Sequence, residues 1–334
     1  MMMTDELVSG HSLMRAVVLD RFGGVEELKT RLLPVPEVGD DDVLIRVHVA
    51  GVGSWDAAER RGDFDGAFGT PSVFPYVLGW DAAGTIASVG RDVSRFRIGD
   101  RVYAATTPLP RGGFYAEYGV VPAEHVTPLP DRLPFEQAGA MAWDALTALS
   151  GLDLLDLEPG DAVMVFGASG GIGHLALQLA RHRGLRVLAV ASGDDGVALA
   201  RRLGADAVVD GRRADVLAAA AEFAPDGLDG ALVTVGGETT ERALRALTDS
   251  GRIAWPHGVH PLPSDALGSR VSFYDGDRSR AAAEGLNAII DSSDLEVHIA
   301  RTFALDDAPS AHRALGDHYI GKLALRVAPD DRRE

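Results

Sequence analysis

The chain has 334 residues, of which 46% are hydrophobic and 24% are charged, and this composition excludes an intrinsically disordered protein. A formal net charge of −17 argues against nucleic acid or an anionic membrane as a general partner, because both bind basic surfaces. The chain has no cysteine, which excludes disulfides, thiolate nucleophiles and cysteine-ligated zinc.

The first residues of the chain are polar, and we expect residues 1–13 to form a mobile extension. Residues 1–14 lack the apolar core of a signal peptide. No run of about 18 apolar residues occurs in the chain, so no membrane-spanning helix is predicted. We therefore expect a cytoplasmic protein whose regular structure begins near Met14.

The first half of the chain is predicted to be mostly β. Its short apolar runs are bounded by turns rich in glycine and proline, and residues 34–39 are expected to form a loop between the first two strands. Prolines at 128, 130 and 134 indicate a boundary after this half. The expected strands are residues 15–19, 43–49, 99–103 and 120–122, with a turn at 50–55 and a glycine-interrupted apolar run at 76–89.

From Phe135 onward, predicted strands alternate with predicted helices, which is typical of a doubly wound parallel sheet. The expected strands are residues 162–166, 187–191, 207–209, 231–235 and 252–255, and the expected helices are 135–152, 172–184, 197–203 and 239–247. After residue 273 we expect a helix to about Ile290, a strand at 297–303, a helix through His312 and a strand at 323–327.

Residues 161–184 combine a short strand, a glycine turn and a helix, the context that a dinucleotide-binding glycine motif requires. Gly170 would let the backbone approach a pyrophosphate, and Gly173 would let the helix lie close to the strand. The free N–H groups and positive dipole end of the helix would receive the phosphate charge. A merely structural turn is the alternative. The predicted loop comprises Gly167, Ala168, Ser169, Gly170, Gly171, Ile172 and Gly173.

Further motifs follow one another in a recognisable order. They are Met-Arg-Ala-Val-Val at 14–18, Gly-Trp-Asp-Ala-Ala-Gly at 79–84, Gly-Asp-Arg-Val at 99–102, the stretch 113–122, Ala-Leu-Thr-Ala-Leu at 145–149, the glycine turn 167–173, Gly-Ala-Asp at 204–206 and Gly-Lys-Leu at 321–323. Together they resemble the medium-chain dehydrogenase/reductase superfamily, and within it the zinc-independent quinone oxidoreductase and zeta-crystallin branch. The resemblance implies hydride transfer from NADPH to a quinone or an activated carbon–carbon double bond, and usually a homodimer.

The resemblance also implies an α/β fold in which a Rossmann cofactor domain interrupts a GroES-like, β-rich catalytic domain. After the extension 1–13, we assign residues 14–133 and 277–334 to the catalytic domain and residues 134–276 to the NADP(H)-binding domain. The segment after residue 276 is too short to fold by itself, so we expect it to return to the first domain. This arrangement predicts a substrate cleft between the domains.

Three positions depart from the zinc-dependent members of the superfamily. By the resemblance, two cysteines and a histidine hold their catalytic metal at positions that look like Gly53, Trp80 and Trp143 here. None of these side chains binds zinc, so no metal is expected. Quinone reductases often carry a pocket asparagine where this chain has Gly53, which leaves quinone specificity open.

Four tryptophans are expected near the reacting groups. The resemblance places Trp55, Trp80 and Trp143 on the substrate side and Trp255 beside the nicotinamide, where an aromatic box would favour flat conjugated substrates. The alternative is that these rings fill the volume left by the lost metal site and stabilise the domain junction. Thr147 matches the family threonine near the nicotinamide.

The sequence also offers candidates for the wall of the nicotinamide site and for the source of the final proton. Val235 and Gly236 match the wall that orients the nicotinamide ring. Solvent, Asp81, Ser54 and His257 are the alternatives for the proton that completes a reduction. A purely structural hydrogen-bonding role fits equally well for Asp56, Asp81 and Asp144.

The end of the second predicted Rossmann strand decides between NAD and NADP. NAD-preferring sites carry an acidic side chain there, which binds the ribose and would repel a 2′-phosphate. The small residues here leave room for a phosphate, although Asp194 and Asp195 follow at once and helix N-capping is the alternative for Asp194. We favour NADP(H). The strand ends in Ala191, Ser192 and Gly193, and the cationic partners are expected among Arg212, Arg213 and Lys322.

Two classes of function are compatible with these features. The one we favour is an NADPH-dependent reductase of a quinone, enone or enoyl group, with a dedicated biosynthetic enoyl reductase as the alternative within this class. The other is an NADPH-binding protein without turnover, in the manner of a crystallin or a redox sensor. A zinc-free alcohol dehydrogenase fits poorly, because polarising a simple carbonyl normally uses the metal.

Overall fold

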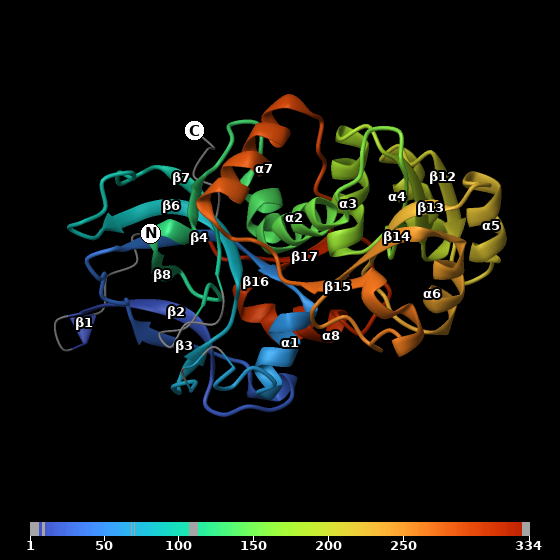
Figure 1. Cartoon of the computed structure of the whole chain (residues 1–334). Helices are drawn as coiled ribbons and strands as arrows, with labels where there is room; N and C mark the ends of the chain where they lie inside the picture. Colours follow the sequence, from blue (N-terminus) through green and yellow to red (C-terminus); the bar gives the residue numbers. More distant parts are fainter. Residues whose placement is uncertain (1–6, 9–10, 68, 70, 107–112, 329–334) are drawn as a thin grey trace. The chain divides into compact units, whose positions relative to one another are not determined.

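The computed structural model of the chain describes residues 7–8, 11–67, 69, 71–106 and 113–328. The chain forms two compact units (Figure 1). Unit 1 comprises Met1–Trp143, Arg278–Arg280 and Ile299–Glu334, and unit 2 comprises Asp144–Asp277 and Ala281–His298. In the part of the chain that the structure describes, no helix is long and apolar enough to cross a membrane.

The larger sheet of unit 1 is built around β4 (Asp42–Val52). Valine and isoleucine dominate this strand, and their branched side chains favour extended backbone. β4 pairs with β6 along its length, with β8 through its first half and with β17 through its second half. The other strands of this sheet are β6 (Asp81–Val89), β7 (Arg101–Ala105), β8 (Tyr118–Pro122), β9 (Val126–Pro128), β16 (Ile299–Ala304) and β17 (Lys322–Arg326).

The smaller sheet of unit 1 contains two strands that the sequence did not predict. β1 (Leu7–Val8) pairs with the start of β2 (His11–Leu19), so regular structure begins before Met14, while residues 1–6 and 9–10 of the expected extension lie outside the described residues. β3 (Lys29–Pro34) also pairs with β2. Most of β3 is exposed, so it lacks the apolar face that would have revealed it. β5 (Tyr76–Val77) pairs with the end of β2.

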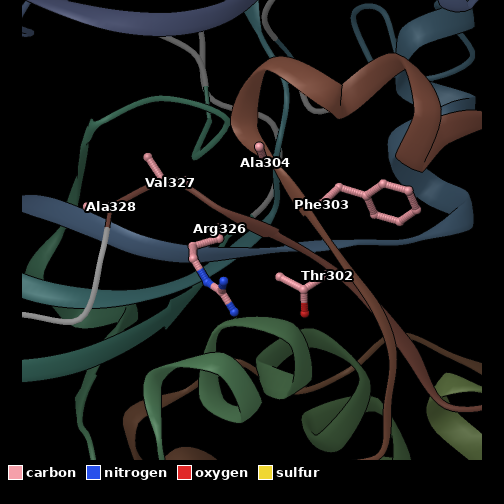
Figure 2. Close-up of a pocket in the computed structure, with 6 residues that line it drawn as sticks. All are labelled: Thr302, Phe303, Ala304, Arg326, Val327 and Ala328. Atoms are coloured by element: carbon pink, nitrogen blue, oxygen red, sulfur yellow. The ribbon is translucent and has the colours of Figure 1, made fainter.

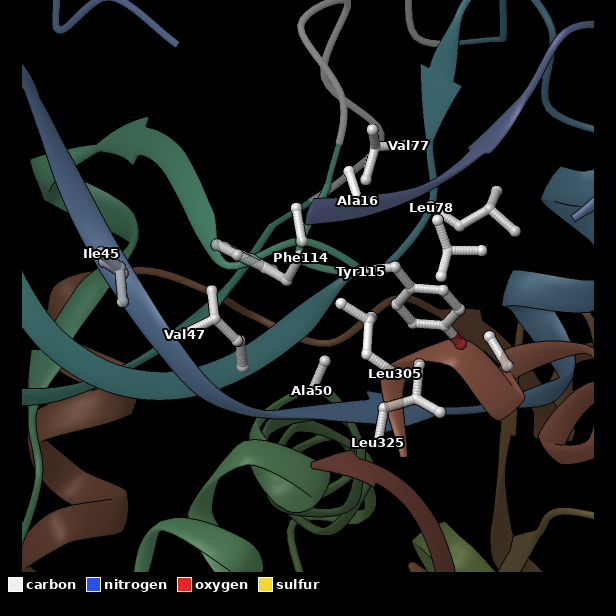
Figure 3. Close-up of a cluster of buried hydrophobic side chains, with 14 of the residues drawn as sticks. Ala16, Ile45, Val47, Ala50, Val77, Leu78, Phe114, Tyr115, Leu305 and Leu325 are labelled. Carbon is white, nitrogen blue, oxygen red and sulfur yellow. The ribbon is translucent and has the colours of Figure 1, made fainter. Parts of the chain in front are cut away.

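The core of unit 1 draws side chains from both of its sheets (Figure 3). Ala16 of β2, Ile45 and Val47 of β4 and Leu325 of β17 are completely buried. Tyr115, in the segment before β8, is equally inaccessible. Helices α1 (Ser54–Arg61) and α8 (Ala308–Ala314) belong to this unit.

Unit 2 contains the doubly wound parallel sheet that the alternation of strands and helices predicts. Its six parallel strands follow the order β12-β11-β10-β13-β14-β15, so β10 has β11 on one side and β13 on the other. The short β15 was not predicted. The strands are β10 (Ala162–Phe166), β11 (Arg186–Ala191), β12 (Ala207–Asp210), β13 (Leu228–Val233), β14 (Leu247–Pro256) and β15 (Val271–Tyr274).

Both faces of this sheet are covered. Met164 and Phe166 of β10 pack in a cluster with Val216 and Ala220 of α5, while the alternate residue Val165 is completely buried on the other side. The sequence did not predict α5, because its alanines lie on every face and produce no apolar stripe. The helices that lie wholly or mostly in unit 2 are α2 (Phe135–Leu155), α3 (Gly171–His182), α4 (Gly193–Arg202), α5 (Val216–Phe223), α6 (Glu238–Ala243) and α7 (Arg280–Ser292). Short 3₁₀ turns occupy Val25–Glu27, Ala123–His125, Leu244–Ala246, Asp265–Arg270 and Leu305–Asp307.

The segment Ala281–His298 belongs to unit 2, whereas the sequence assigned it to the catalytic domain. Side chains of α3 explain this placement. The Gln178 amide donates to the Glu296 carbonyl and accepts from the Glu296 N–H, at 2.9 and 2.8 Å. The His298 N–H donates to His174 Nε2 at 3.2 Å. These long-range bonds have no local sequence signature.

Candidate active site

The loop between β10 and α3 presents mainly backbone atoms at the start of the helix. Gly167 has φ +90°, a left-handed conformation that favours glycine. A Cβ atom on Gly173 would lie 2.1 Å from the Gly167 carbonyl oxygen, so glycine is needed for α3 to pack this close. At Gly170 the nearest atom to an added Cβ is 3.4 Å away, which leaves the loop open there. The N-cap residue of α3 is Gly170, which has no side chain to cap the first turn, so the N–H groups there suit an anionic ligand.

The chain after β13 lies against this loop. Thr234 Oγ1 donates to the Phe166 carbonyl oxygen at 2.9 Å, and a Cβ on Gly167 would lie 2.2 Å from the same Thr234 oxygen. Val235, expected at the nicotinamide, is 50% exposed. An added Cβ at Gly236 would lie 2.1 Å from the Pro261 carbonyl oxygen, so this position also requires a bare backbone. The carboxyl ends of β10 and β13 thus form a small-residue edge with one exposed apolar side chain.

The turns after β11 and β12 meet next to the glycine loop. Ser192 is the N-cap residue of α4, and its N–H donates to Ser169 Oγ at 3.3 Å. Asp210, at the end of β12, accepts from the Gly193 and Arg212 N–H groups at 3.4 and 3.0 Å. These contacts place Arg212 near the residues that the sequence assigned to the ribose. The bond from Arg212 N–H is the largest cause of the lowered pKa of Asp210.

Asp194 does not cap α4. Ser192 occupies the N-cap position, so the N-capping interpretation of Asp194 is wrong. Asp194 instead pairs with Arg213 at 2.7 Å, with side-chain exposures of 86% and 66%. Arg213 also lies 3.6 Å from Asp210, so one guanidinium is shared between two carboxylates. An ion pair this exposed adds little stability, and its main effect is to offset negative charge near Ser192.

Two residues expected at the cofactor are buried. Trp255 is completely buried in the core of unit 2, where its Nε1–H donates to the Val259 carbonyl oxygen at 3.1 Å. Trp255 offers no exposed surface, so its predicted contact with the nicotinamide is wrong. Lys322 lies in unit 1, is 3% exposed and places Nζ 4.9 Å from the centre of the Trp55 ring. Trp255 is thus used in core packing, and Lys322 is used in a cation–π contact.

Thr147 lies on α2 in unit 2, beside the loop that follows β15. It is 3% exposed, and a Cβ on Gly276 would lie 2.8 Å from its Oγ1. Gly276 follows the carboxyl end of β15, and ligands of open α/β sheets bind at carboxyl ends of strands. Thr147 therefore lies next to the expected edge of the sheet, although little of it is accessible.

Three of the four tryptophans gather in unit 1. The ring centres of Trp80 and Trp143 are 4.7 Å apart in an edge-to-face arrangement. Trp55 lies 6.1 Å from Trp143 and 6.4 Å from Trp80, and Phe64 lies 5.2 Å from Trp80. Trp80 is 4% exposed, whereas Trp55 and Trp143 are half-buried. These four side chains are termed the aromatic cluster.

The Trp55 indole covers Gly53. A Cβ on Gly53 would lie 2.5 Å from Cε2 and Cζ2 of Trp55, so the ring occupies the space that a side chain at position 53 would need. Cations accompany both half-buried rings, because Lys322 lies over Trp55 and the Arg278 guanidinium lies 4.9 Å from the centre of the Trp143 ring. Aromatic rings and cations therefore surround the position where the resemblance placed a metal ligand or a pocket asparagine.

Helix α1 carries buried acidic side chains next to the aromatic cluster. Asp56 is completely buried, and its Oδ2 accepts from the Gly53 N–H at 2.7 Å. Burial, and after it the charge of Glu59, raises the pKa of Asp56 well above its usual range. Glu59 accepts from the Tyr76 hydroxyl at 2.5 Å and from Trp80 Nε1–H at 2.8 Å. Burial raises the pKa of Glu59 from 4.5 to about 7, although these two hydrogen bonds lower it.

Asp81 serves as a structural acceptor. It is completely buried, and its Oδ2 accepts from the Trp143 N–H at 3.3 Å. A Cβ on Gly51 would lie 2.2 Å from Asp81 Oδ1, so the glycine makes room for the carboxyl group. Of the two roles considered for Asp81, this geometry favours hydrogen bonding within the fold over proton donation to a substrate.

On its other side, α1 joins a buried chain of polar groups. Arg60 Nη1 lies 3.0 Å from His312 Nδ1, and His312 Nε2 lies 3.3 Å from the Tyr115 hydroxyl. Arginine only donates, so Nδ1 of His312 must accept and the imidazole must be neutral. Burial, followed by the charge of Arg60, lowers the pKa of His312 from 6.5 to about 3.

The other two side chains considered as proton donors are exposed. Ser54 is the first residue of α1. His257 follows β14, and its Nδ1 lies 3.1 Å from Asp275 Oδ2, with side-chain exposures of 57% and 70%. The His257 ring also stacks on Phe273, with ring centres 6.0 Å apart. His257 is therefore oriented by two neighbours at the carboxyl end of β15.

A cavity of about 260 Å³ lies in unit 1, and no member of the aromatic cluster lines it (Figure 2). The Thr302 hydroxyl and the Arg326 guanidinium both donate to Glu136 Oε1, at 2.7 and 3.0 Å. None of the residues predicted for catalysis or cofactor binding lines it. Its lining residues are Thr302, Phe303, Ala304, Arg326, Val327 and Ala328.

Comparison with known proteins identifies the family. Residues 39–131 match the alcohol dehydrogenase GroES-like domain, and residues 171–256 match the zinc-binding dehydrogenase family. The quinone oxidoreductase of Mus musculus is 31% identical over 338 residues, covering 96% of this chain and 99% of the relative. The chain belongs to the medium-chain dehydrogenase/reductase superfamily, in its quinone oxidoreductase-like branch.

Two solved structures extend this relationship within the medium-chain dehydrogenase/reductase superfamily. An NAD-dependent alcohol dehydrogenase superposes with a TM-score of 0.85 at 30% identity, over 94% of this chain and 100% of the other. A mycobacterial protein complexed with NADPH superposes with a TM-score of 0.80 at 26% identity, over the same shares. The protein is therefore an oxidoreductase of this superfamily, whose Rossmann domain binds a nicotinamide cofactor.

Several residues of these sites escaped sequence reasoning. Glu59 and Arg278 contact the aromatic cluster, and Tyr76 contacts Glu59; the three come from separate parts of the chain, so no local pattern joins them. Thr234 directly precedes the predicted Val235 and Gly236, and its place at a strand end was the available signal.

Proposed function

We propose that the protein is an NADPH-dependent, zinc-independent reductase that transfers hydride to a quinone or an activated carbon–carbon double bond. The observation that carries this proposal is the aromatic cluster. The positions that resemble the metal ligands of zinc-dependent members hold Gly53, Trp80 and Trp143. Trp55 fills the space above Gly53, and two half-buried rings offer flat apolar surface for a conjugated acceptor.

The glycine loop fits a dinucleotide. The open side at Gly170 and the uncapped first turn of α3 would hold the pyrophosphate, and Val235 would support the nicotinamide. When bound, the cofactor would supply a hydride from C4 of its nicotinamide. Arg212 would contact the 2′-phosphate beside Ser192, with Arg213 offsetting Asp194 and Asp210. The NADPH complex of the mycobacterial relative supports this assignment.

The chain's own contribution to the reaction is positioning. The half-buried rings of Trp55 and Trp143 would stack on a flat conjugated acceptor and restrict its orientation for hydride transfer. The acceptor gains the hydride and one proton, and NADPH becomes NADP⁺. His257, oriented by Asp275, or solvent would supply the proton. A conjugated acceptor disperses the charge that a simple ketone would concentrate on one oxygen, which is why no metal is required.

A panel of acceptors tests this function. Purified protein is mixed with NADPH and each of several quinones, enones and matching saturated ketones, with and without a metal chelator. We expect NADPH oxidation with a quinone or an enone, none with the saturated ketones, and no effect of the chelator. Tight NADPH binding without oxidation by any acceptor would favour the non-catalytic, crystallin-like alternative. Rapid reduction of saturated ketones that the chelator abolishes would refute the zinc-free proposal.

We also propose a homodimer that forms through unit 2. β15 is the last strand of the parallel sheet, and edge strands pair readily with another chain. Phe273 on β15 is 46% exposed, which is high for a large apolar side chain. Sedimentation should show a dimer for the natural protein and a larger monomer fraction for Phe273→Lys. A natural protein that sediments as a monomer would refute the proposal.

A further inference from the structure

Glu59 joins two hydrogen-bond donors from other parts of unit 1. Trp80 Nε1–H donates to Glu59 Oε2 at 2.8 Å, and the Tyr76 hydroxyl donates to Oε1 at 2.5 Å. Glu59 is 3% exposed and Trp80 is 4% exposed, so water hardly competes for these bonds. The carboxylate therefore fixes the direction in which the buried indole lies.

Trp80 in turn supports the two rings proposed to receive the acceptor. Trp80 meets Trp143 edge-to-face at 4.7 Å and Trp55 at 6.4 Å between ring centres. Both neighbours are half-buried, whereas Trp80 is buried behind them. Because rings at these distances interdigitate, a rotation of the Trp80 indole would require Trp55 and Trp143 to move as well.

We propose that Glu59 is a positioning residue whose negative charge anchors Trp80, and through Trp80 the acceptor-binding rings, so that protonation of Glu59 weakens acceptor binding. The effect on the acceptor rests on the proposed function of the aromatic cluster. The anchoring of Trp80 by Glu59 does not.

The two donors constrain what protonation of Glu59 does. An indole N–H only donates, so the added proton must lie on Oε1, where the Tyr76 hydroxyl can turn and accept it. Trp80 then donates to a neutral oxygen, and a charge-assisted hydrogen bond becomes a weaker neutral one. With its pKa raised by burial to about 7, Glu59 would make this change near neutral pH. The titratable groups that interact with Glu59 are Asp56 on α1, Tyr76 on β5 and Tyr115 before β8.

An NMR titration of the indole groups tests the anchor without turnover. The chain has four tryptophans, so ¹⁵N labelling of the indole nitrogens gives four Nε1–H signals, and Trp80→Phe identifies the one from Trp80. Between about pH 5 and 9 we expect the Trp80 signal to shift with a midpoint near 7, in line with the raised pKa of Glu59. A Trp80 signal that does not move across this range would overturn the proposal.

Three variants sharpen the titration. Glu59→Gln can accept from Trp80 and donate to Tyr76, so it keeps the geometry and should leave the Trp80 signal independent of pH. Tyr76→Phe removes a hydrogen bond that lowers the pKa of Glu59, so the midpoint should rise, by on the order of one unit. Glu222→Gln makes the same charge change at an exposed position of α5 and should leave the titration as it is. A Trp80 titration that persists in Glu59→Gln would assign the shift to another group.

A kinetic measurement tests the link to the acceptor. With a quinone or enone that the natural protein reduces, the KM for the acceptor should rise about threefold or more as the pH falls from 8 to 6, with kcat changing less. Glu59→Gln should show a KM that does not depend on pH. A KM profile that is the same in the natural protein and in Glu59→Gln would contradict the kinetic half of the proposal. Absence of any turnover would refute the proposed function but would leave the NMR result standing.

Discussion

The glycine loop of unit 2 and the α1 region of unit 1 are built in opposite ways. The loop is made of backbone and small residues. Its main features are the close approach of Gly173 to Gly167 and the uncapped first turn of α3. The α1 region is made of long side chains, because Asp56, Glu59 and Arg60 are all buried on a single helix. A site built from closely packed backbone tolerates few substitutions, whereas the contacts of a site built from side chains can be changed by single substitutions.

The two regions also differ in what they respond to. The glycine loop itself has no titratable side chain, and its contact with a titratable group is that of the Gly170 carbonyl oxygen with His174 Nδ1 at 2.8 Å. Around α1, burial raises the pKa of Glu59 to about 7 and lowers that of His312 to about 3. We therefore expect steric changes to disrupt the glycine loop, and changes in charge or pH to affect the α1 region.

The largest effect is expected from Gly173→Ala. The new Cβ would lie 2.1 Å from the Gly167 carbonyl oxygen, so α3 must move away from the loop. We expect a loss of about 3 kcal/mol in the free energy of unfolding and a loss of NADPH affinity of about 100-fold or more. Denaturant unfolding and cofactor titration measure the two effects. Gly170→Ala is the control, because its Cβ has room and should weaken NADPH binding with little change in stability.

His312 should make the protein sensitive to acid. Its pKa is lowered from 6.5 to about 3, so its stabilising effect is complete above pH 6.5 and is lost as the pH falls towards 3. Between pH 7 and 4, the natural protein should lose on the order of 3 kcal/mol more stability than His312→Gln. Urea unfolding at each pH measures the difference. An unchanged difference between the two proteins across this range would mean that His312 is not held neutral.

Glu59 should have the opposite dependence on pH. Its pKa is raised from 4.5 to about 7, so the stability it contributes is complete below pH 4.5 and is lost as the pH rises through 7. From pH 4.5 to 8, the natural protein should lose on the order of 3 kcal/mol relative to Glu59→Gln. The same unfolding series tests this prediction. A stability difference that stays constant with pH would show that the carboxyl group titrates normally.

A side chain at position 53 should conflict with Trp55. The Cβ of Gly53→Asn would lie 2.5 Å from the Trp55 ring, and we expect a loss of about 2 kcal/mol in the free energy of unfolding. In a Trp55→Ala background the same substitution should cost less than about 1 kcal/mol, because the space is vacated. A double-mutant cycle measured by unfolding gives the coupling. Additive effects would mean that the ring does not occupy this space.

The smallest effect is expected from Arg212→Ala. If its guanidinium contacts the 2′-phosphate, the Kd for NADPH should rise about tenfold, equivalent to about 1.4 kcal/mol, while the Kd for NADH stays the same. Paired titrations followed by tryptophan fluorescence measure both constants. Arg201→Ala removes an equally exposed charge from α4 and serves as the control. An equal loss for NADH would place Arg212 away from the phosphate.

The sequence by itself determined the parts of the molecule that depend on local chemistry. The strand, glycine turn and helix at 161–184 predicted the cofactor loop, because positive φ and close helix packing demand glycine at fixed spacing. The alternation of strands and helices predicted the doubly wound sheet. The family motifs predicted the superfamily, which the comparisons confirmed.

Only the tertiary structure decided which side chains share a site. The sequence predicted Trp255 at the nicotinamide and gave Lys322 as one candidate partner of the 2′-phosphate, yet Trp255 is completely buried in the core of unit 2 and Lys322 is buried with its Nζ over the Trp55 ring. Glu59 carried no signal, because its partners Tyr76 and Trp80 are distant in the chain. Burial and hydrogen bonding arise from contacts between distant segments, so they set the pKa of Glu59 and the arrangement of the tryptophan rings without leaving a pattern in the sequence.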